Sequence, residues 1–416
     1  MLDIRPIHRK EYELDAGRAG KEAQPEQAPV KGGKAAGDAP QKGKNQGINS
    51  ITVAQAPGRI HFLGEHGDPG TGLYLTAAID RWVMVAVSAR RDNSLRFYAA
   101  DLSERKRTTL INLKYKREDR WANFVKAAII VFTGMNLPVK GMNFTIMGNI
   151  PQQIGLASST AIEVAAAVAL KGFLRVKIGE QELARRLAAA HSRFFGKDPD
   201  PVDYIVGLSA RKDQFLVVDE SDYSVMKIKS PFARCKFILM DSRVPRLGVD
   251  DELETRREDL KAALDILSQG RGGASFREFA AMDLMESMGN LPEKIRRKSL
   301  HVVQEIHRVQ EARDYLLRAD LAGFSRLVFH SHESLRDLYE VSCPEIDWMV
   351  KRAQETAGVL GARMTGQGFG GCTYTIIKNE VLDEFKNRIE DYERIFGFRP
   401  IIYEVKLATG SHTVPG

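Results

Sequence analysis

The sequence predicts an α+β protein built from more than one domain. The chain has 416 residues, of which 43% are hydrophobic, and this size suits two or three domains with sizeable cores. Runs rich in β-branched residues, which favour strands, alternate with segments that have the three- and four-residue apolar spacing of helices. Three glycine-rich segments interrupt these elements, and they carry the most specific functional information.

Composition limits the class of partner. The net charge of +7 comes from 61 basic and 54 acidic residues, a modest excess that gives little support to a nucleic-acid partner but favours anionic ligands such as nucleotides. No apolar run reaches the roughly 18–20 residues of a membrane span, and the charged N-terminus lacks the apolar stretch of a signal peptide. The 3 cysteines are dispersed and lack metal-ligand spacing. We therefore expect a cytoplasmic protein with reduced thiols that binds neither membranes nor nucleic acid.

The first fifty residues differ from the rest. Residues 15–49 consist mainly of Gly, Ala, Lys, Gln and Pro, with almost no large apolar side chains. Such a segment buries too little surface to offset its ordering entropy, so we expect a flexible linker. Residues 1–14 contain a few apolar side chains and are expected to form an N-terminal extension.

The globular part is expected to begin near Ile51. An alanine-rich run, Ala161–Leu170, predicts a strong helix directly after a glycine-bearing loop, because alanine is the best helix former. The stretch from Asp250 to about Leu338 is predicted to be mostly helical. A βαβ-like pattern ends the chain, with helices near 346–356 and 381–392. The predicted strands are 51–55, 82–88, 142–147, 215–219, 236–241, 372–377 and 401–405.

The first glycine-rich segment, 55–72, predicts a site for a small polyol. It places Arg59, Glu65, His66 and Asp68 within ten residues of one another. Such a density of polar groups beside a strand-like run is a poor way to build a core, but it suits the binding of sugar hydroxyls. A solvated surface turn that happens to be charged is the alternative.

The second segment, 148–160, precedes the alanine-rich helix. The first turn of a helix leaves backbone N–H groups without partners, and the helix dipole adds a partial positive charge there. Small residues let a phosphate approach that end closely, and hydroxyls can reach a metal ion that bridges the phosphates. The residues that fit such an anion cradle are Gly155, Ala157, Ser158, Ser159 and Thr160. An ordinary serine-rich helix cap remains the alternative, and the Lys-bearing P-loop motif is absent.

The third segment, 364–372, is the richest in glycine. Gly366, Gly368, Gly370 and Gly371 come directly before a predicted strand. Glycines at this density indicate a backbone that adopts positive φ or that lies very close to another group. A tight structural turn would use the same residues.

Taken together and in this order, the three segments resemble the signatures of the GHMP kinases, and the galactokinase family fits best. Residues 55–72 resemble its first signature, Ala-Pro-Gly-Arg followed by Gly-Glu-His-x-Asp, and residues 151–161 resemble its second. Residues 361–372 match the third except at Gln367, where the family usually has Gly. The similarity covers nearly everything from Ile51 onward.

This resemblance implies a two-domain GHMP kinase fold. Residues 50–232 would form an N-terminal domain like domain 2 of ribosomal protein S5, and residues 233–416 a ferredoxin-like C-terminal domain with helical insertions. It also implies an ATP-dependent sugar kinase, a phosphotransferase with an alcohol acceptor, that uses Mg²⁺. The γ-phosphoryl group would pass to a hydroxyl of a monosaccharide or polyol, most often the anomeric one. We expect a monomer or weak oligomer.

The resemblance also assigns roles to residues. The family's carboxylate base corresponds to Asp203 and its signature arginine to Arg59, and an Asp beside an Arg should stay ionised at neutral pH. Ser159 corresponds to the serine that helps to hold magnesium. The sugar-binding positions are Glu65, His66 and Asp68, with Asp200 where the family's sugar touches bare backbone. The nucleotide-binding positions are Gly155, Leu156, Ala157, Ser158, Ser159 and Thr160.

The sequence departs from the family around the metal and the sugar. His191 replaces a Glu that assists the magnesium site, and imidazole is a poor substitute for a hard oxygen ligand. Asp200 adds a carboxylate, and Leu253 stands near the position of a Tyr that contacts the sugar. Two hypotheses follow: a kinase whose substrate is not plain galactose, or a sugar- or nucleotide-binding regulatory protein with weak or no activity. Arg59 and Asp203 favour the first, and His191 favours the second.

Overall fold

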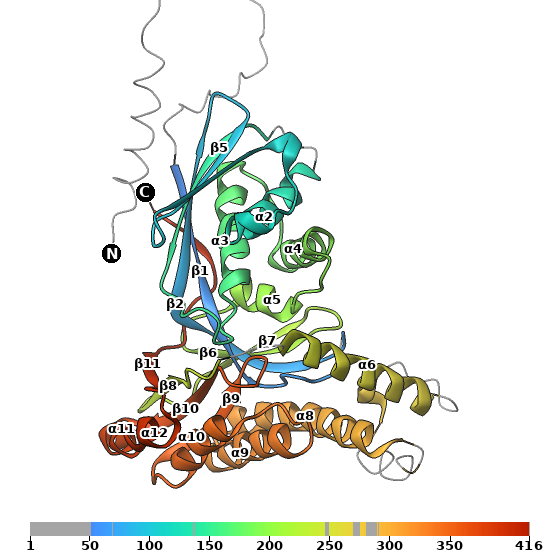
Figure 1. Cartoon of the computed structure of the whole chain (residues 1–416), viewed down its shortest axis with the longest axis vertical. Helices are drawn as coiled ribbons and strands as arrows, with labels where there is room; N and C mark the ends of the chain where they lie inside the picture. The colour runs from blue at the N-terminus through green and yellow to red at the C-terminus, as the bar shows by residue number, and fades with distance from the viewer. Residues whose placement is uncertain are drawn as a thin grey trace, which may run out of the picture.

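The computed structural model describes residues 51–416 apart from 69, 136, 138, 246–248, 269–274, 280–288, 290 and 416. The predicted extension at 1–14 and the predicted linker at 15–49 lie outside the described residues. Within the described part, no helix is both long and apolar enough to span a bilayer. The described chain forms two β-sheets, each covered by helices, as Figure 1 shows.

The first sheet has the strand order β12-β1-β2-β5-β3-β4, and β6 and β7 extend it from β2. Its first strand continues through Pro57 and Gly58, well beyond the predicted end at residue 55. The strand tolerates these two residues because its pairing register with β2 shifts between them, as in a β-bulge. The strands are β1 (Ile51–Leu63), β2 (Leu73–Ala89), β3 (Ser94–Ala99), β4 (Glu104–Thr109), β5 (Met142–Gly148), β6 (Gln214–Asp219), β7 (Val225–Lys229) and β12 (His412–Val414).

Four helices cover one face of this sheet (Figure 1). They are α2 (Ala122–Thr133), α3 (Ser158–Phe173), α4 (Glu180–Phe195) and α5 (Pro201–Ser209). The predicted alanine-rich helix is α3, and its alanines from Ala165 to Ala167 are fully buried against the core. Small side chains let α3 lie close to β1 and β2, and this close packing fixes the position of its N-terminus relative to the strands.

The second sheet has the order β11-β8-β10-β9, with every neighbouring pair antiparallel. Because β8 lies between β10 and β11, the predicted βαβ pattern is present in its split form, which is the ferredoxin-like arrangement. Strand β9 was not predicted, and its last two residues, 364 and 365, belonged to the predicted third loop. The elements are β8 (Cys235–Asp241), β9 (Val359–Thr365), β10 (Cys372–Lys378), α11 (Leu382–Ile389), α12 (Asp391–Phe396) and β11 (Ile401–Val405).

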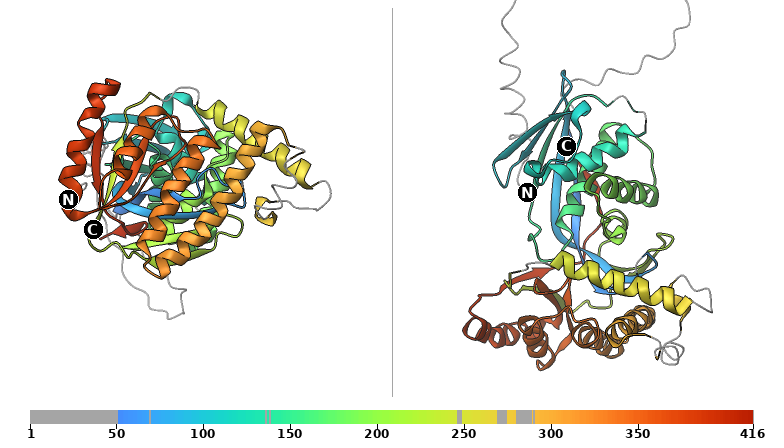
Figure 2. Two further views of the ribbon diagram at one scale, coloured as in Figure 1. Left: turned by 90° about the horizontal axis from the view of Figure 1, so that it is seen from below. Right: turned by 45° about the vertical axis from the view of Figure 1, so that its right-hand side comes forward.

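Longer helices complete the C-terminal half. The predicted helical stretch between 250 and 338 is confirmed where it is described, by α6, α8 and α9, and α10 matches the next predicted helix. Figure 2 shows α8 to α12 together at the lower end of the molecule in its right-hand view; α9 and α10 pack against β9, and α8 packs against α9, β1 and β2. The helices are α6 (Val249–Ser268), α8 (Glu293–Leu317), α9 (Leu321–Asp337) and α10 (Pro344–Gln354), with a short 3-10 helix η3 (Phe276–Glu278) between α6 and α8.

The two halves share a core at the C-terminal end of β1. The Tyr374 hydroxyl of β10 donates to the Phe62 carbonyl of β1 at 2.7 Å, and the two rings are 4.8 Å apart. The predicted boundary at 232/233 falls between β7 and β8, but the final strand β12 returns to pair with β1. The predicted division into 50–232 and 233–416 therefore stays a prediction. The two sheets with their covering helices confirm the predicted α+β class.

Candidate functional site

The structure brings Arg59 and Asp203 together. Arg59 lies on β1 and Asp203 in the first turn of α5, and the arginine Nε donates to the aspartate Oδ1 at 2.5 Å. Both residues are 8% exposed, so the pair is buried in the protein. A guanidinium N–H of Arg59 also donates to the Gly155 carbonyl, which ties the pair to the second glycine-rich loop.

Opposite charge keeps this pair ionised. Burial alone would raise the pKa of Asp203, but Arg59 and His61 outweigh burial and hold it below its ordinary value. Burial opposes the charge of Arg59 as well, yet Asp203, Glu65 and Asp200 raise its pKa above the ordinary value. At neutral pH the site therefore contains a carboxylate that can accept a proton, beside a cation that can stabilise phosphate charge.

The N-terminus of α5 positions Asp203. The Asp200 side chain is the helix cap, and its Oδ1 accepts from the Val202 backbone N–H at 2.9 Å. Pro201 occupies the first helical position, where a missing N–H costs nothing. The capping bond fixes the rotamer of Asp200, and the geometry of α5 fixes the position of Asp203. As a result, Asp200 Oδ2 and Asp203 Oδ1 both face His61.

His61 is a site residue that the sequence analysis missed. Its Nε2 lies 3.3 Å from Asp203 Oδ1 and 3.4 Å from Asp200 Oδ2, and the residue has no exposed surface. The signal was available in the strand period: side chains two residues apart point to the same face, so His61 must lie on the same side of β1 as Arg59.

Glu65 and His66 contact the C-terminal half. Glu65 accepts from the Gly366 N–H at 2.5 Å and from Arg363 at 3.0 Å. The His66 ring lies 5.0 Å from that of Tyr339, and burial together with Arg363 lowers its pKa to about 3, so the imidazole is neutral. These contacts orient both side chains, and their role in sugar binding stays a prediction.

One oxygen of Asp68 is available for a ligand. Its Oδ2 accepts from Thr71 Oγ1 at 2.5 Å, from Ser275 Oγ at 2.5 Å and from the Phe276 N–H at 2.8 Å, which holds η3 over the first loop. Its Oδ1 is buried and has no hydrogen-bond partner among the described residues. A buried carboxylate oxygen without a partner is costly unless a ligand hydroxyl donates to it.

The second and third glycine-rich loops touch each other. A Cβ added to Gly155, which has a φ of +87°, would lie 2.8 Å from the Gly366 Cα, and one added to Gly366 would meet Gly155 in the same way. For two other glycines of the third loop, Gly368 and Gly370, the structure supports the alternative interpretation of a tight structural turn. A Cβ at Gly368 would meet the Val341 carbonyl oxygen at 2.5 Å, and a Cβ at Gly370 would meet Val244 at 3.0 Å. Gly371 also has a positive φ, of +79°.

A cavity of about 830 Å³ opens at the N-terminus of α3 and includes Ser158 and Ser159 in its wall. Ala157 precedes the helix in the left-handed conformation, and no side chain caps the first turn, so its N–H groups are not used by a protein cap. Basic side chains line the cavity at Arg117, Arg120 and Lys197. Its aromatic residues are Tyr115, Trp121, Phe124 and Phe195. Aromatic rings beside a cationic, uncapped helix end suit a purine nucleotide.

His191 is bound to a buried carboxylate rather than directed to solvent. Its Nδ1 lies 2.7 Å from Glu163 Oε1, and the Tyr204 hydroxyl donates to Glu163 Oε2 at 2.7 Å. Glu163 is fully buried, and His191 and Tyr204 each engage one of its two carboxylate oxygens. Ser159 lines the cavity with a hydroxyl oxygen, a ligand type that suits Mg²⁺ beside waters and phosphate oxygens, and its role in holding the ion stays a prediction. Leu253 packs in the hydrophobic cluster of α6 and is 6% exposed.

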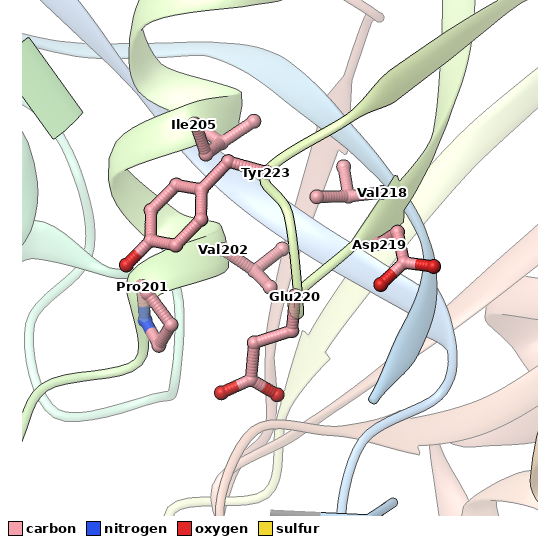
Figure 3. A pocket seen from close by; sticks show the side chains of 7 residues that line it. All are labelled: Pro201, Val202, Ile205, Val218, Asp219, Glu220 and Tyr223. Carbon is pink, nitrogen blue, oxygen red and sulfur yellow. The ribbon is translucent and has the colours of Figure 1, made fainter. Parts of the chain in front are cut away.

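The carboxylate of Glu220 lines a small depression at the start of α5. Figure 3 shows it beside Pro201 and Val202, with Tyr223 on the same wall. Its Oε2 accepts from the Gly72 N–H at 3.2 Å. Burial, reinforced by the nearby charge of Asp200, raises the pKa of Glu220 to about 7.

This raised pKa gives stability a defined pH dependence. Between the unfolded value and about 7 the folded state binds more protons than the unfolded state, so stability falls as pH rises through that window. We expect Glu220→Gln to unfold on the order of 2 °C above the wild type at pH 8, and at the same temperature near pH 4.5. Thermal unfolding of the ligand-free protein measures this, and an equal difference at both pH values would contradict the assignment.

Comparison with known proteins adds family information. Residues 44–89 match a model described as the galactokinase galactose-binding signature, residues 123–208 match the GHMP kinase N-terminal domain, and residues 312–393 match the GHMP kinase C-terminal domain. A relative from Treponema pallidum is 34% identical over 367 residues, which cover 87% of this chain and 92% of that one. The galactokinase of Roseiflexus sp. is 31% identical, with coverage of 88% and 94%.

Two solved structures are similar to this chain in fold. The galactokinase of Lactococcus lactis, complexed with galactose, has a TM-score of 0.83 at 25% identity, covering 88% of this chain and 96% of that one. The mevalonate kinase of Methanococcus jannaschii has a TM-score of 0.59 at 18% identity, covering 87% and 99%, and it shares the fold.

Proposed function

This chain belongs to the galactokinase family of the GHMP kinases, and from that premise we propose that it transfers the γ-phosphoryl group of ATP to the anomeric hydroxyl of a monosaccharide other than plain galactose. The observation that carries the proposal is the buried pair of Arg59 and Asp203, joined through Gly155 to the loop that opens α3. A carboxylate, a guanidinium and an uncapped helix N-terminus in contact with one another supply what phosphoryl transfer requires.

Each part of the pair has a separate task. The carboxylate of Asp203 accepts the proton of the attacking hydroxyl, and its Oδ2 lies 3.5 Å from Thr160 Oγ1 in the first turn of α3. Arg59 stabilises the negative charge of the phosphoryl group during transfer, and the N–H groups at the start of α3 bind the phosphates. Mg²⁺, held with the help of Ser159, would neutralise phosphate charge when bound.

The proposal of a substrate other than plain galactose rests on the pocket wall. Asp200, with its side chain 32% exposed, adds a carboxylate beside Asp203. Leu253 is apolar and packs in a hydrophobic cluster, so it supplies no hydroxyl group near the position where the family has a Tyr. A charged wall discriminates among sugars by the hydroxyl or amine that it faces.

The test is a phosphate-transfer screen of the purified protein. Hexoses, pentoses, amino sugars, uronic acids and inositols are incubated with Mg²⁺-ATP, and sugar phosphate is measured directly. We expect turnover of at least one monosaccharide with a kcat/KM at least tenfold above that for galactose. Galactose as the best substrate would overturn the substrate proposal, and turnover of no member would overturn the kinase proposal.

The second candidate is a binding or regulatory protein with little transfer activity, and the engagement of Glu163 by His191 favours it. Replacing His191 with Glu restores the family's carboxylate at the edge of the nucleotide cavity. If the metal ligand limits turnover, His191→Glu raises kcat at least tenfold in the presence of Mg²⁺. An unchanged kcat would remove this residue as the cause of any weak activity.

Asp68 is expected to act on the sugar and not on the nucleotide. Its free Oδ1 is the acceptor proposed for a sugar hydroxyl, and Asp68→Ala also removes the three contacts of Oδ2 with the first loop and η3. We expect the KM for the sugar to rise more than tenfold, while the KM for ATP changes less than threefold. Steady-state kinetics with each substrate varied measures both, and equal losses would contradict the role.

A further inference from the structure

We propose that His61, Asp200 and Asp203 form a site for a divalent transition-metal ion with mixed nitrogen and oxygen ligands, such as Mn²⁺. One ligand atom from each of the three residues lies within 4.8 Å of the other two, and His61 Nε2 faces Asp200 Oδ2 at 3.4 Å and Asp203 Oδ1 at 3.3 Å. His61 comes from β1, Asp200 is the N-cap of α5, and Asp203 lies in the first turn of that helix.

The imidazole is set in the tautomer that binds metals. The Thr76 hydroxyl donates its one hydrogen to the Ile60 carbonyl at 2.9 Å, so it must accept from His61 Nδ1, which lies 3.0 Å away. With the hydrogen of a neutral ring placed on Nδ1, the lone pair of Nε2 points to the two carboxylates. Metal-binding histidines are usually oriented by a second-shell partner at the other nitrogen in this way.

The Nε2 atom itself lacks a partner within the described chain. It is fully buried and makes no hydrogen bond of acceptable geometry, although two carboxylate oxygens lie near it. The separations of 3.4 and 3.3 Å from His61 Nε2 to the two carboxylates are compatible with ligand atoms that share an ion at about 2.0–2.2 Å, because adjacent ligand atoms then lie about 3.0–3.4 Å apart.

The neighbouring arginine leaves room for this role. Arg59 uses one lone-pair direction of Asp203 Oδ1, and a carboxylate oxygen has two. Two carboxylates lie beside one guanidinium here, so the acidic groups outnumber the fixed cation and the site favours a bound cation. The Asp200 Oδ1 atom is already used in capping α5, which leaves Oδ2 for the ion.

The ion would lie beside the proposed base, and this consequence rests on the proposed function. A sugar hydroxyl entering an open coordination position would have its pKa lowered by the ion and its proton transferred to a nearby carboxylate oxygen. The mixed ligand set distinguishes the site from the Mg²⁺ that accompanies nucleotide phosphates, because imidazole nitrogen favours Mn²⁺ or Zn²⁺ over Mg²⁺.

Electron paramagnetic resonance of Mn²⁺ titrated into the full chain, without nucleotide or sugar, tests the proposal. The free-ion signal should reveal one saturable site. Asp200→Asn keeps the helix cap but removes a charged ligand, and it should weaken binding at least tenfold, as should His61→Gln. Thr76→Val keeps all three ligands and should weaken binding by roughly tenfold through the loss of the second-shell partner.

His332→Gln is the matched control, since it alters another buried histidine that is paired with a carboxylate. It should change the Mn²⁺ affinity less than twofold. Thermal unfolding adds a second readout: Mn²⁺ should raise the melting temperature of the wild type and not that of Asp200→Asn. Absence of a saturable site, an affinity unchanged by Asp200→Asn, or loss of binding in His332→Gln would each overturn the proposal. Because no transfer reaction is measured, such a result would leave the kinase proposal standing.

Discussion

Replacing Asp203 with Asn is expected to lower kcat by on the order of 10³-fold, because the substitution removes the proton acceptor while it keeps the shape of the side chain. The amide oxygen can still accept from Arg59 Nε, so the Arg59 contact with Gly155 should persist. ATP affinity should therefore change less than threefold. Single-turnover phosphate transfer and nucleotide titration on the same preparation measure the two quantities.

Asp213→Asn provides the matched control for this variant. Asp213 is exposed and has a φ of +57°, which Asn tolerates well, so the chemical change is the same without a buried partner. It should retain wild-type activity. Asp203→Asn is expected to unfold at a lower temperature than Asp213→Asn because it leaves the Arg59 charge less well compensated. Full activity in Asp203→Asn would remove this residue from the mechanism.

Local sequence patterns predicted the parts of the fold that local forces determine. The strands β5, β6, β8 and β10 lie within one residue of their predicted ranges, and α3 extends the predicted alanine-rich helix by three residues at each end. Strand β9 was missed because its residues run directly into the glycine-rich loop, and only pairing with β10 stabilises them as a strand. The length of β1 was underestimated for a similar reason: Pro57 and Gly58 disfavour a strand locally, and the β2 partner tolerates them through a bulge.

The candidate site was predictable in its chemistry but not in its contacts. The motif residues Arg59 and Asp203 meet because two distant segments fold together, and family resemblance was enough to pair them. His61 carries no motif of its own, since a single histidine on a strand is more often a core residue than a ligand. Asp200 was noticed as an added carboxylate, but only the structure shows that it faces His61.

Gly155→Ala is expected to be the most damaging change of a single methyl group. The new Cβ would lie 2.8 Å from the Gly366 Cα, a backbone atom that cannot rotate away, and alanine would have to adopt a φ near +87°. Left-handed backbone costs alanine about 1–2 kcal/mol, and overpacking adds about 1–3 kcal/mol. We expect a loss of about 2–4 kcal/mol in unfolding free energy, measured by denaturant titration.

Activity should fall with stability in this variant, because separation of the two loops moves the Gly155 carbonyl that holds Arg59. Gly397→Ala separates strain from clash: Gly397 has a φ of +75° with nothing within 4 Å of an added Cβ, and it lies at the end of α12, away from the site. It should cost about 1 kcal/mol and leave kcat/KM unchanged. If the two variants lose equal stability and both remain fully active, the contact between the second and third loops does not hold Arg59 in place.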